Sequence, residues 1–175
     1  DIHIHVGKGD GCFISSKQIK HFKSKCVAPE VSEEMLLEDI ARSEFDIVAL
    51  AFDKPYDGNE VNYFVLNEYV VDLAKKYDRI HPGISINPER EDAIDELDKY
   101  KDIAALIKWS PGVMRFDPSD KKYAKFYQKL AEYNIPILSH SGGEKNIIQG
   151  SEKGLINPNK LRYALDEGVK IIAAH

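Results

Sequence analysis

Short apolar stretches alternate along the chain with longer stretches in which apolar and polar residues recur at helical spacing. The apolar stretches predict six strands, at residues 1–6, 46–52, 80–86, 103–109, 136–140 and 170–175. The second of these is apolar from residue 47 to residue 52, as expected for a strand of a parallel sheet that is covered on both faces.

Amphipathic segments between these strands predict five helices, at residues 33–41, 66–77, 93–100, 123–131 and 158–167. The clearest apolar stripe repeats at i, i+3, i+4, i+7 and i+8 and consists of Tyr123, Phe126, Tyr127, Leu130 and Ala131. Asn134 and Gly168 are suited to the left-handed conformation that ends a helix. Asn157 followed by Pro158 predicts the start of the last helix.

Strict alternation of strands and helices predicts an α/β fold with parallel strands and right-handed crossovers. Two architectures fit: an open doubly wound sheet, or a distorted (β/α)₈ TIM barrel of which this chain holds only about the first six strands. We expect one barrel domain over residues 1–175. The chain opens on a strand without Met and closes on a strand, so we also expect it to be truncated at both ends.

The first strand carries two histidines on one face. Successive side chains of a strand point to opposite faces, so His3 and His5 share one face while Ile2, Ile4 and Val6 share the other. Two adjacent imidazoles have no room between the helix layers of a doubly wound sheet, whereas in a barrel they face the central axis. A divalent metal ion would satisfy both, and this favours the barrel.

Two further histidines end predicted strands. His140 is the last residue of the fifth strand and His175 the last of the sixth. In a TIM barrel the carboxyl ends of the strands form the rim that carries the active site. Lys108 lies near the end of the fourth strand, where a buried amine needs a partner, a modification or an anionic substrate. His21 and His81 fall elsewhere and are predicted to be non-catalytic.

Several loop residues lie at the same rim. Asp53 follows the second strand, and Trp109 and Arg115 follow Lys108, so we predict all three to contact substrate. The segment 8–31 is longer than most loops in compact domains and is predicted to be a substrate-side loop.

Charge and composition exclude some classes of function. The net charge is −5 and the pI about 5.7, so a basic nucleic-acid-binding face is not expected. The longest apolar run, residues 47–52, is too short for a membrane span. Two cysteines favour reduced thiols in a cytoplasmic protein, and a zinc cluster of Cys12, His21 and Cys26 is only a weak alternative because no Cys-x-x-Cys spacing is present. The expected partner is a small-molecule substrate, with a homodimer possible.

Five segments carry a resemblance to a known family, in order along the whole chain: DIHIH at 1–5, IKWSP at 107–111, FDPSD at 116–120, PILSHSG at 136–142 and IAAH at 172–175. Together they resemble the amidohydrolase superfamily. Within it they are most similar to the amidohydrolase-related branch that includes aminocarboxymuconate-semialdehyde decarboxylase.

The resemblance implies roles for individual residues. His3, His5 and His140 match metal ligands. His175 matches a histidine that either binds a second metal ion or contacts substrate and moves protons. Lys108 matches a position that holds a carboxylated, metal-bridging lysine in two-metal members and need not bind metal in the decarboxylase-like branch. The aspartate that the family carries on its eighth strand is expected to lie beyond this chain.

These residues predict a metal-dependent hydrolase that attacks a C–N or C–O bond of a small molecule. Imidazole ligands suit Zn²⁺, with Mn²⁺ or another divalent ion as alternatives, and such an ion lowers the pKa of a bound water to about 7. His175 and Lys108 would orient the substrate or stabilise an oxyanion. Two alternatives stay open: a non-oxidative decarboxylase of the same fold, and a catalytically inactive metal-binding barrel.

Overall fold

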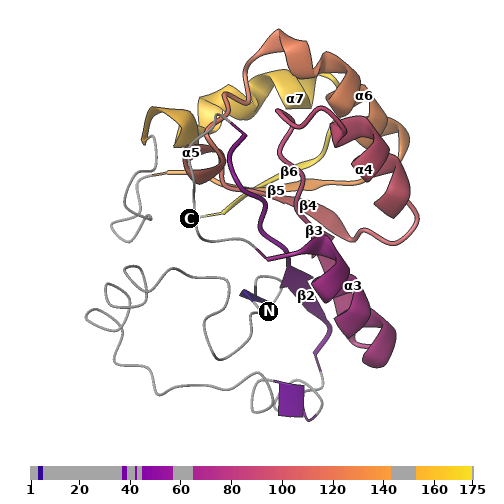
Figure 1. Ribbon diagram of the computed structural model, residues 1–175. Helices are drawn as coiled ribbons and strands as arrows, with labels where there is room; N and C mark the ends of the chain where they lie inside the picture. The colour runs from indigo at the N-terminus through magenta and orange to yellow at the C-terminus, as the bar shows by residue number, and fades with distance from the viewer. Residues whose placement is uncertain are drawn as a thin grey trace.

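A computed structural model describes residues 4–5, 37–38, 42, 45–56, 65–142 and 153–174 of the chain. Its strands form one parallel sheet in which each strand lies beside its neighbour in the sequence (Figure 1). The six strands are β1 (Ile4–His5), β2 (Ile47–Leu50), β3 (Ile80–Ile84), β4 (Leu106–Trp109), β5 (Ile137–His140) and β6 (Ile171–Ala174). The predicted α/β class with six parallel strands is confirmed.

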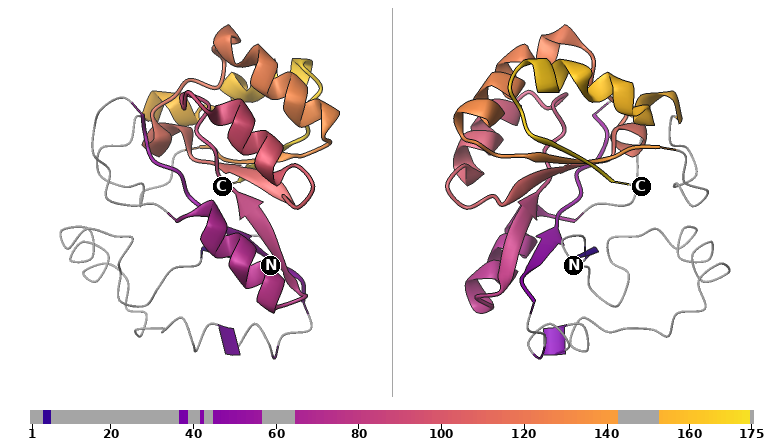
Figure 2. Two further views of the ribbon diagram at one scale, coloured as in Figure 1. Left: turned by 45° about the vertical axis from the view of Figure 1, so that its right-hand side comes forward. Right: turned by 180° about the vertical axis from the view of Figure 1, so that it is seen from behind.

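Helices connect the strands and cover one face of the sheet (Figures 1 and 2). The α-helices are α3 (Asn67–Lys76), α4 (Ala93–Tyr100), α5 (Pro111–Met114), α6 (Ala124–Glu132) and α7 (Arg162–Asp166). Three 3₁₀ segments accompany them, η1 (Lys121–Tyr123), η2 (Lys153–Ile156) and η3 (Pro158–Leu161). Within the described ranges no helix is long and apolar enough to cross a membrane.

The two faces of the sheet pack into separate apolar clusters. The helix-side cluster takes its strand residues from alternate positions, such as Ile107 and Trp109 of β4 and Ile137 of β5. The opposite face holds a smaller cluster of Leu50, Leu106 and Leu138, with Val48 and Ala174 against it. Side chains on this second face point toward the side that a closed barrel would enclose.

Polar contacts join neighbouring helices across the outer surface. Lys99 and Tyr100 at the end of α4 both donate to the carboxylate of Glu68 at the start of α3, each at 2.7 Å. Tyr133, just after α6, donates to Asp98 of α4, and Gln128 of α6 donates to Glu167 after α7. Each contact joins the helix layer of one strand to that of the next, so the helices are held in the same order as the strands.

The predicted helix ends are largely confirmed. Asn134 and Gly168 adopt left-handed conformations with φ of 56° and 89°. The Asn157 side chain accepts from the backbone N–H of Asn159 and begins η3. Of the predicted helix 33–41, only Leu37 and Glu38 lie among the described residues, and both are helical.

Other boundaries differ from the sequence prediction. The fourth strand begins at Leu106 rather than residue 103, because residues 101–103 form the turn that ends α4, and the Ile103 side chain is 48% exposed. The predicted turn after Trp109 is a short helix, α5, which has Pro111 at its first position. The last predicted helix divides into η3 and α7.

Candidate active site at the carboxyl ends of the strands

Lys108 and His140 lie on adjacent strands at the carboxyl edge of the sheet. Ile107 and Trp109 pack on the helix side, so the Lys108 side chain between them lies on the opposite face, with Leu106 and Leu138. Lys108 is paired in register with Leu138 and is only 2% exposed. His140 ends β5 two residues after Leu138, on the same face, and is half-buried. A buried amine and an imidazole therefore share the face and the edge that the sequence predicts for the site.

The other predicted histidines are described only in part. His5 is described by its backbone, which pairs with Leu50 of β2, so it ends β1 on the same sheet. His3 and His175 lie outside the described residues, as does the whole predicted loop 8–31 with Cys12, His21 and Cys26 of the weak zinc alternative. The described part of the chain brings no group of three or more His, Cys, Asp or Glu side chains together as a metal site. The predicted metal ligands therefore remain predictions.

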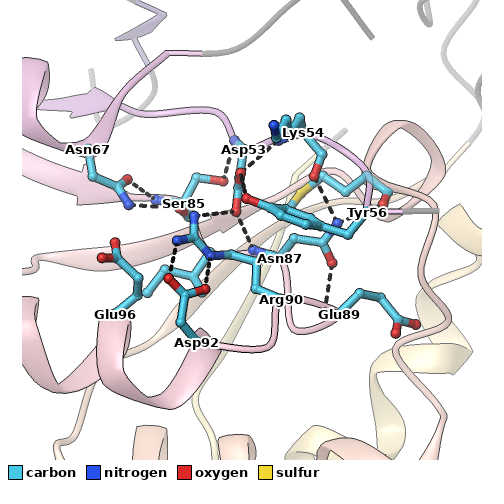
Figure 3. A network of polar contacts seen from close by, with 12 residues as sticks. Asp53, Lys54, Tyr56, Asn67, Ser85, Asn87, Glu89, Arg90, Asp92 and Glu96 are labelled. Atoms are coloured by element: carbon cyan, nitrogen blue, oxygen red, sulfur yellow. Dashed lines mark hydrogen bonds and ion pairs between the residues drawn. The ribbon is translucent and has the colours of Figure 1, made fainter. Parts of the chain in front are cut away.

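Asp53 lies just after β2 and organises the neighbouring loop (Figure 3). Its carboxylate accepts the backbone N–H groups of Lys54 and Asn87, both at 2.8 Å, and the Tyr56 hydroxyl at 3.3 Å. Arg90 Nη1 lies 3.6 Å from the same carboxylate. The side chain is only 10% exposed, so Asp53 is tied into the protein by several donors rather than presented to solvent.

Burial and hydrogen bonds act in opposite directions on the acidity of this carboxyl group. Desolvation is the largest effect and raises the pKa of Asp53 above its usual value. The hydrogen bonds from the Asn87 and Lys54 backbones and the charge of Arg90 lower the pKa, but by less. Burial also raises the pKa of Tyr56 to about 12. The Arg90 guanidinium is held by a bidentate contact with Asp92, at 2.8 and 2.7 Å, which raises its pKa further.

Ser85 connects this region to Lys108. The Ser85 hydroxyl accepts the backbone N–H of Asp53 at 3.0 Å and donates to the backbone oxygen of Lys108 at 2.8 Å. The Asn67 side chain, at the start of α3, bonds both the backbone N–H and the backbone oxygen of Ser85, at 2.8 and 3.0 Å. Ser85 and Asn67 are buried, so the end of β3 is fixed from both sides.

Asn87 joins three consecutive loops. Its side-chain amide donates to the backbone oxygen of Lys54, after β2, at 2.9 Å and to that of Met114, at the end of α5, at 2.8 Å. Its side-chain oxygen accepts the backbone N–H of Glu89 at 3.1 Å. Asn87 is 0% exposed, and its bond to Met114 is buried while those to Lys54 and Glu89 are partly buried.

A pocket of about 330 Å³ opens beside this network. Its walls come from the loop after β2, the start of α3 and the region from the end of β3 to α4, and they include Phe52, Asp53, Tyr56, Asn67, Ser85 and Arg90. Lys54 and Arg90 lie 5.6 and 5.5 Å from the centre of the Tyr56 ring. Small-molecule sites commonly have volumes of about 300–1,000 Å³. Asp53 thus lies in a pocket wall, where its predicted substrate contact stays a prediction.

Trp109, which the sequence predicts to contact substrate, lies in the apolar core on the helix side of the sheet. Trp109 is 0% exposed and lies on the helix side of β4, with its ring centre 4.7 Å from that of Phe116 and 5.9 Å from that of Phe126. Its indole N–H donates to the backbone oxygen of Ile86 at 2.8 Å. Strand alternation places Trp109 on the face opposite to Lys108, so it serves the core.

Arg115 and His81 complete the predicted set. Arg115 follows α5 in a left-handed conformation with φ of 56° and is half-buried at the carboxyl edge, where its predicted substrate contact remains untested. His81 is at the second position of β3, near the opposite edge, and its Nε2 lies 3.2 Å from Asp46.

Sequence reasoning missed Ser85, Asn87, Arg90, Asn67 and Tyr56. The position of Ser85 and Asn87 at the end of the third predicted strand was an available signal, because carboxyl ends of barrel strands carry functional groups. Nothing in the sequence indicated that Asn67, which belongs to a predicted helix, would bond Ser85.

No family model and no curated protein matches the chain. Among solved structures, an uncharacterized TIM-barrel protein from Bordetella bronchiseptica matches with a TM-score of 0.63 and 21% identity over 81% of this chain and 50% of its own. The apo form of IDCase from Metarhizium anisopliae matches with a TM-score of 0.47 and 13% identity over 82% of this chain and 46% of its own. The chain therefore spans about half the length of these proteins, and the first match shows that its fold is that of part of a TIM barrel.

Proposed function

We propose that the chain forms part of a metal-dependent hydrolase that uses a metal-activated water to attack a C–N or C–O bond of a small molecule. The observation that carries the proposal is the pair of Lys108 and His140 on adjacent strands, on one face and at the carboxyl edge. The carboxyl edge is where TIM-barrel enzymes hold their reacting groups.

The ligands of the ion would be His3, His5 and His140. The donor set fits, because neutral imidazoles suit Zn²⁺ and similar divalent ions, and His140 lies half-buried at the required edge. When bound, the ion would supply a water of lowered pKa and polarise the bond under attack. The metal site is a proposal that rests on the residue types and on the strand ends that carry them.

The chain's own residues would bind and orient the substrate. Lys108 would place a positive charge beside the oxygen that becomes negative during attack, and His175 would move a proton at the neighbouring strand end. Asp53 and Arg115 would contact the rest of the substrate. The pocket walled by Asp53, Tyr56 and Arg90 would receive a polar part of it.

A non-oxidative decarboxylase is the second candidate, and the burial of Lys108 favours it as well. A cationic side chain on the site face, 2% exposed, suits a substrate that carries a carboxylate, because opposite charges attract more strongly where water is scarce. The same residues would then hold a carboxylic acid that loses CO₂.

Metal analysis and a substrate panel test the proposal together. The protein would be loaded with Zn²⁺ or Mn²⁺ and incubated with lactones, amides and aromatic carboxylates, with release of acid and of CO₂ measured separately. We expect His140→Ala to lose both bound metal and turnover, and Lys108→Met to lose turnover while retaining metal.

His81→Ala is the matched control, because it removes an imidazole from the opposite edge of the sheet. Metal that stays bound in His140→Ala, or is lost equally in His81→Ala, would contradict the proposed site. Bound metal that stabilises the fold, with no turnover on any substrate, would instead support the inactive metal-binding barrel.

A further inference from the structure

Backbone pairing between β3 and β4 stops one residue before Lys108. The register pairs Gly83 with Leu106 and Ile84 with Ile107, and goes no further. On its other side β4 stays paired with β5 through Lys108 and Trp109. The end of β4 that carries Lys108 is therefore held by a backbone ladder on one side only.

Side chains take the place of the missing backbone contacts. The Ser85 hydroxyl donates to the Lys108 oxygen at 2.8 Å, and the Trp109 indole N–H donates to the Ile86 oxygen at 2.8 Å. Ser85 is opposite Lys108 when the register of β3 and β4 is continued by one residue. The Ser85 hydroxyl therefore holds the backbone of Lys108 from the β3 side.

Ser85 is itself well fixed. Asn67 bonds its backbone N–H and oxygen, and the Asp53 N–H donates to its hydroxyl oxygen. Because this oxygen accepts from Asp53, the hydroxyl hydrogen is directed toward Lys108. Ser85 is 2% exposed, so water does not compete readily for these bonds.

We propose that Ser85 is a positioning residue for Lys108: its hydroxyl holds the Lys108 backbone so that the buried amine keeps its place on the site face. The catalytic importance of this position rests on the proposed function, whereas the placement of Lys108 does not. Asp53 and Asn67 act through Ser85, since they fix the group that contacts Lys108.

The test measures how readily Lys108 reacts with acetic anhydride, followed by peptide mass spectrometry, with exposed Lys121 as the internal reference. Ser85→Ala removes the hydroxyl donor, and loss of a buried hydrogen bond of this kind corresponds to an increase of about tenfold in the labelling rate of Lys108. Ser85→Thr restores the hydroxyl and is expected to restore slow labelling.

Tyr127→Phe is the matched control. It also removes one buried hydroxyl that donates to a backbone oxygen, that of Pro118 at 2.7 Å, but on the helix side of the sheet. We expect it to lower stability and to leave Lys108 as slow to label as in the unaltered protein. Three results would each overturn the proposal: unchanged labelling in Ser85→Ala, equal acceleration in Tyr127→Phe, or no restoration in Ser85→Thr.

Turnover of the Lys108→Met variant, measured beside the labelling test, separates the two proposals. Turnover that survives in Lys108→Met would remove the catalytic role of Lys108 from the proposed function. The labelling of Lys108 in Ser85→Ala would still decide whether Ser85 positions it.

Discussion

The backbone N–H of Asn87 donates to the carboxylate of Asp53 at 2.8 Å, although 34 residues separate them in the sequence. This bond joins the loops that follow β2 and β3. The Asn87 side chain extends the connection to Met114 after β4, so three consecutive loops at the carboxyl edge share one set of buried and partly buried hydrogen bonds. These three loops are therefore held together before any substrate arrives.

Asn87→Ala tests how much this connection stabilises the fold. The substitution leaves the buried backbone oxygen of Met114 and the partly buried backbone oxygen of Lys54 without their amide donor. We expect the free energy of unfolding to fall by about 2 kcal/mol. Urea denaturation followed by circular dichroism measures the change. Ser119→Ala, which removes an exposed hydroxyl contact with Asp117, should change the midpoint little. Equal midpoints for both variants would contradict the role of Asn87.

Gly83 is predicted to be intolerant of a side chain. A Cβ at this position would lie 2.6 Å from Leu50 Cδ2 and 2.9 Å from Val48 Cγ1, within the cluster on the site face. Overpacking of this kind should lower stability by about 1–3 kcal/mol in Gly83→Ala. Gly154→Ala is the control, because a Cβ there meets nothing within 4 Å. Thermal unfolding of the two variants gives the comparison, and an unchanged melting temperature for Gly83→Ala would count against the close packing.

The burial of Trp109 can be read directly, because it is the only tryptophan in the chain. Its 0% exposure predicts fluorescence emission at the short wavelengths of a buried indole, with little quenching by iodide. Trp109→Phe also removes the donor to Ile86, which should lower the free energy of unfolding by about 1–3 kcal/mol. Strong iodide quenching in the native protein would instead show that Trp109 is accessible to solvent.

Glu68 gives a prediction that depends on pH. Hydrogen bonds from Lys99 and then Tyr100 lower the pKa of Glu68 from 4.5 to about 2, so the folded state favours its ionised form. The resulting stability is present above pH 4.5 and is lost as the pH falls toward 2. Because its side chain is 58% exposed, Glu68→Gln should cost less than about 1 kcal/mol at neutral pH.

Urea midpoints measured across this range would show the difference between Glu68→Gln and the unaltered protein shrinking with acidity. Tyr100→Phe removes one of the two donors and should weaken the effect. A difference that is constant with pH would show that the contact contributes no charge-dependent stability.

Much of the fold could be predicted because the hydrophobic pattern reflects burial directly. The fourth predicted helix is a clear example: Phe126, Tyr127 and Leu130 are all buried, as their spacing indicates. Residues that adopt a left-handed conformation at helix ends could also be predicted, as Asn134 shows. Strand ends were predicted less well, since the turn after α4 contains apolar Ile103, which resembles strand sequence yet is exposed.

The candidate site was harder to predict because it depends on contacts between distant residues. The alternation in β4 separates Lys108 from Trp109, and the assignment of Trp109 to substrate contact overlooked that separation. Position alone placed Asp53 at the correct edge, but its contacts with the Asn87 backbone N–H and the Arg90 guanidinium depend on the fold. The same holds for Ser85, whose three partners are far away in the sequence.

The spatial order of the strands is identical to their order along the chain. During synthesis, each strand of this sheet can therefore pair with the strand that was made just before it. None of these strands depends on a segment that is made later. Growth of the sheet in one direction lets each strand pair with the one made before it, which allows stepwise assembly during translation.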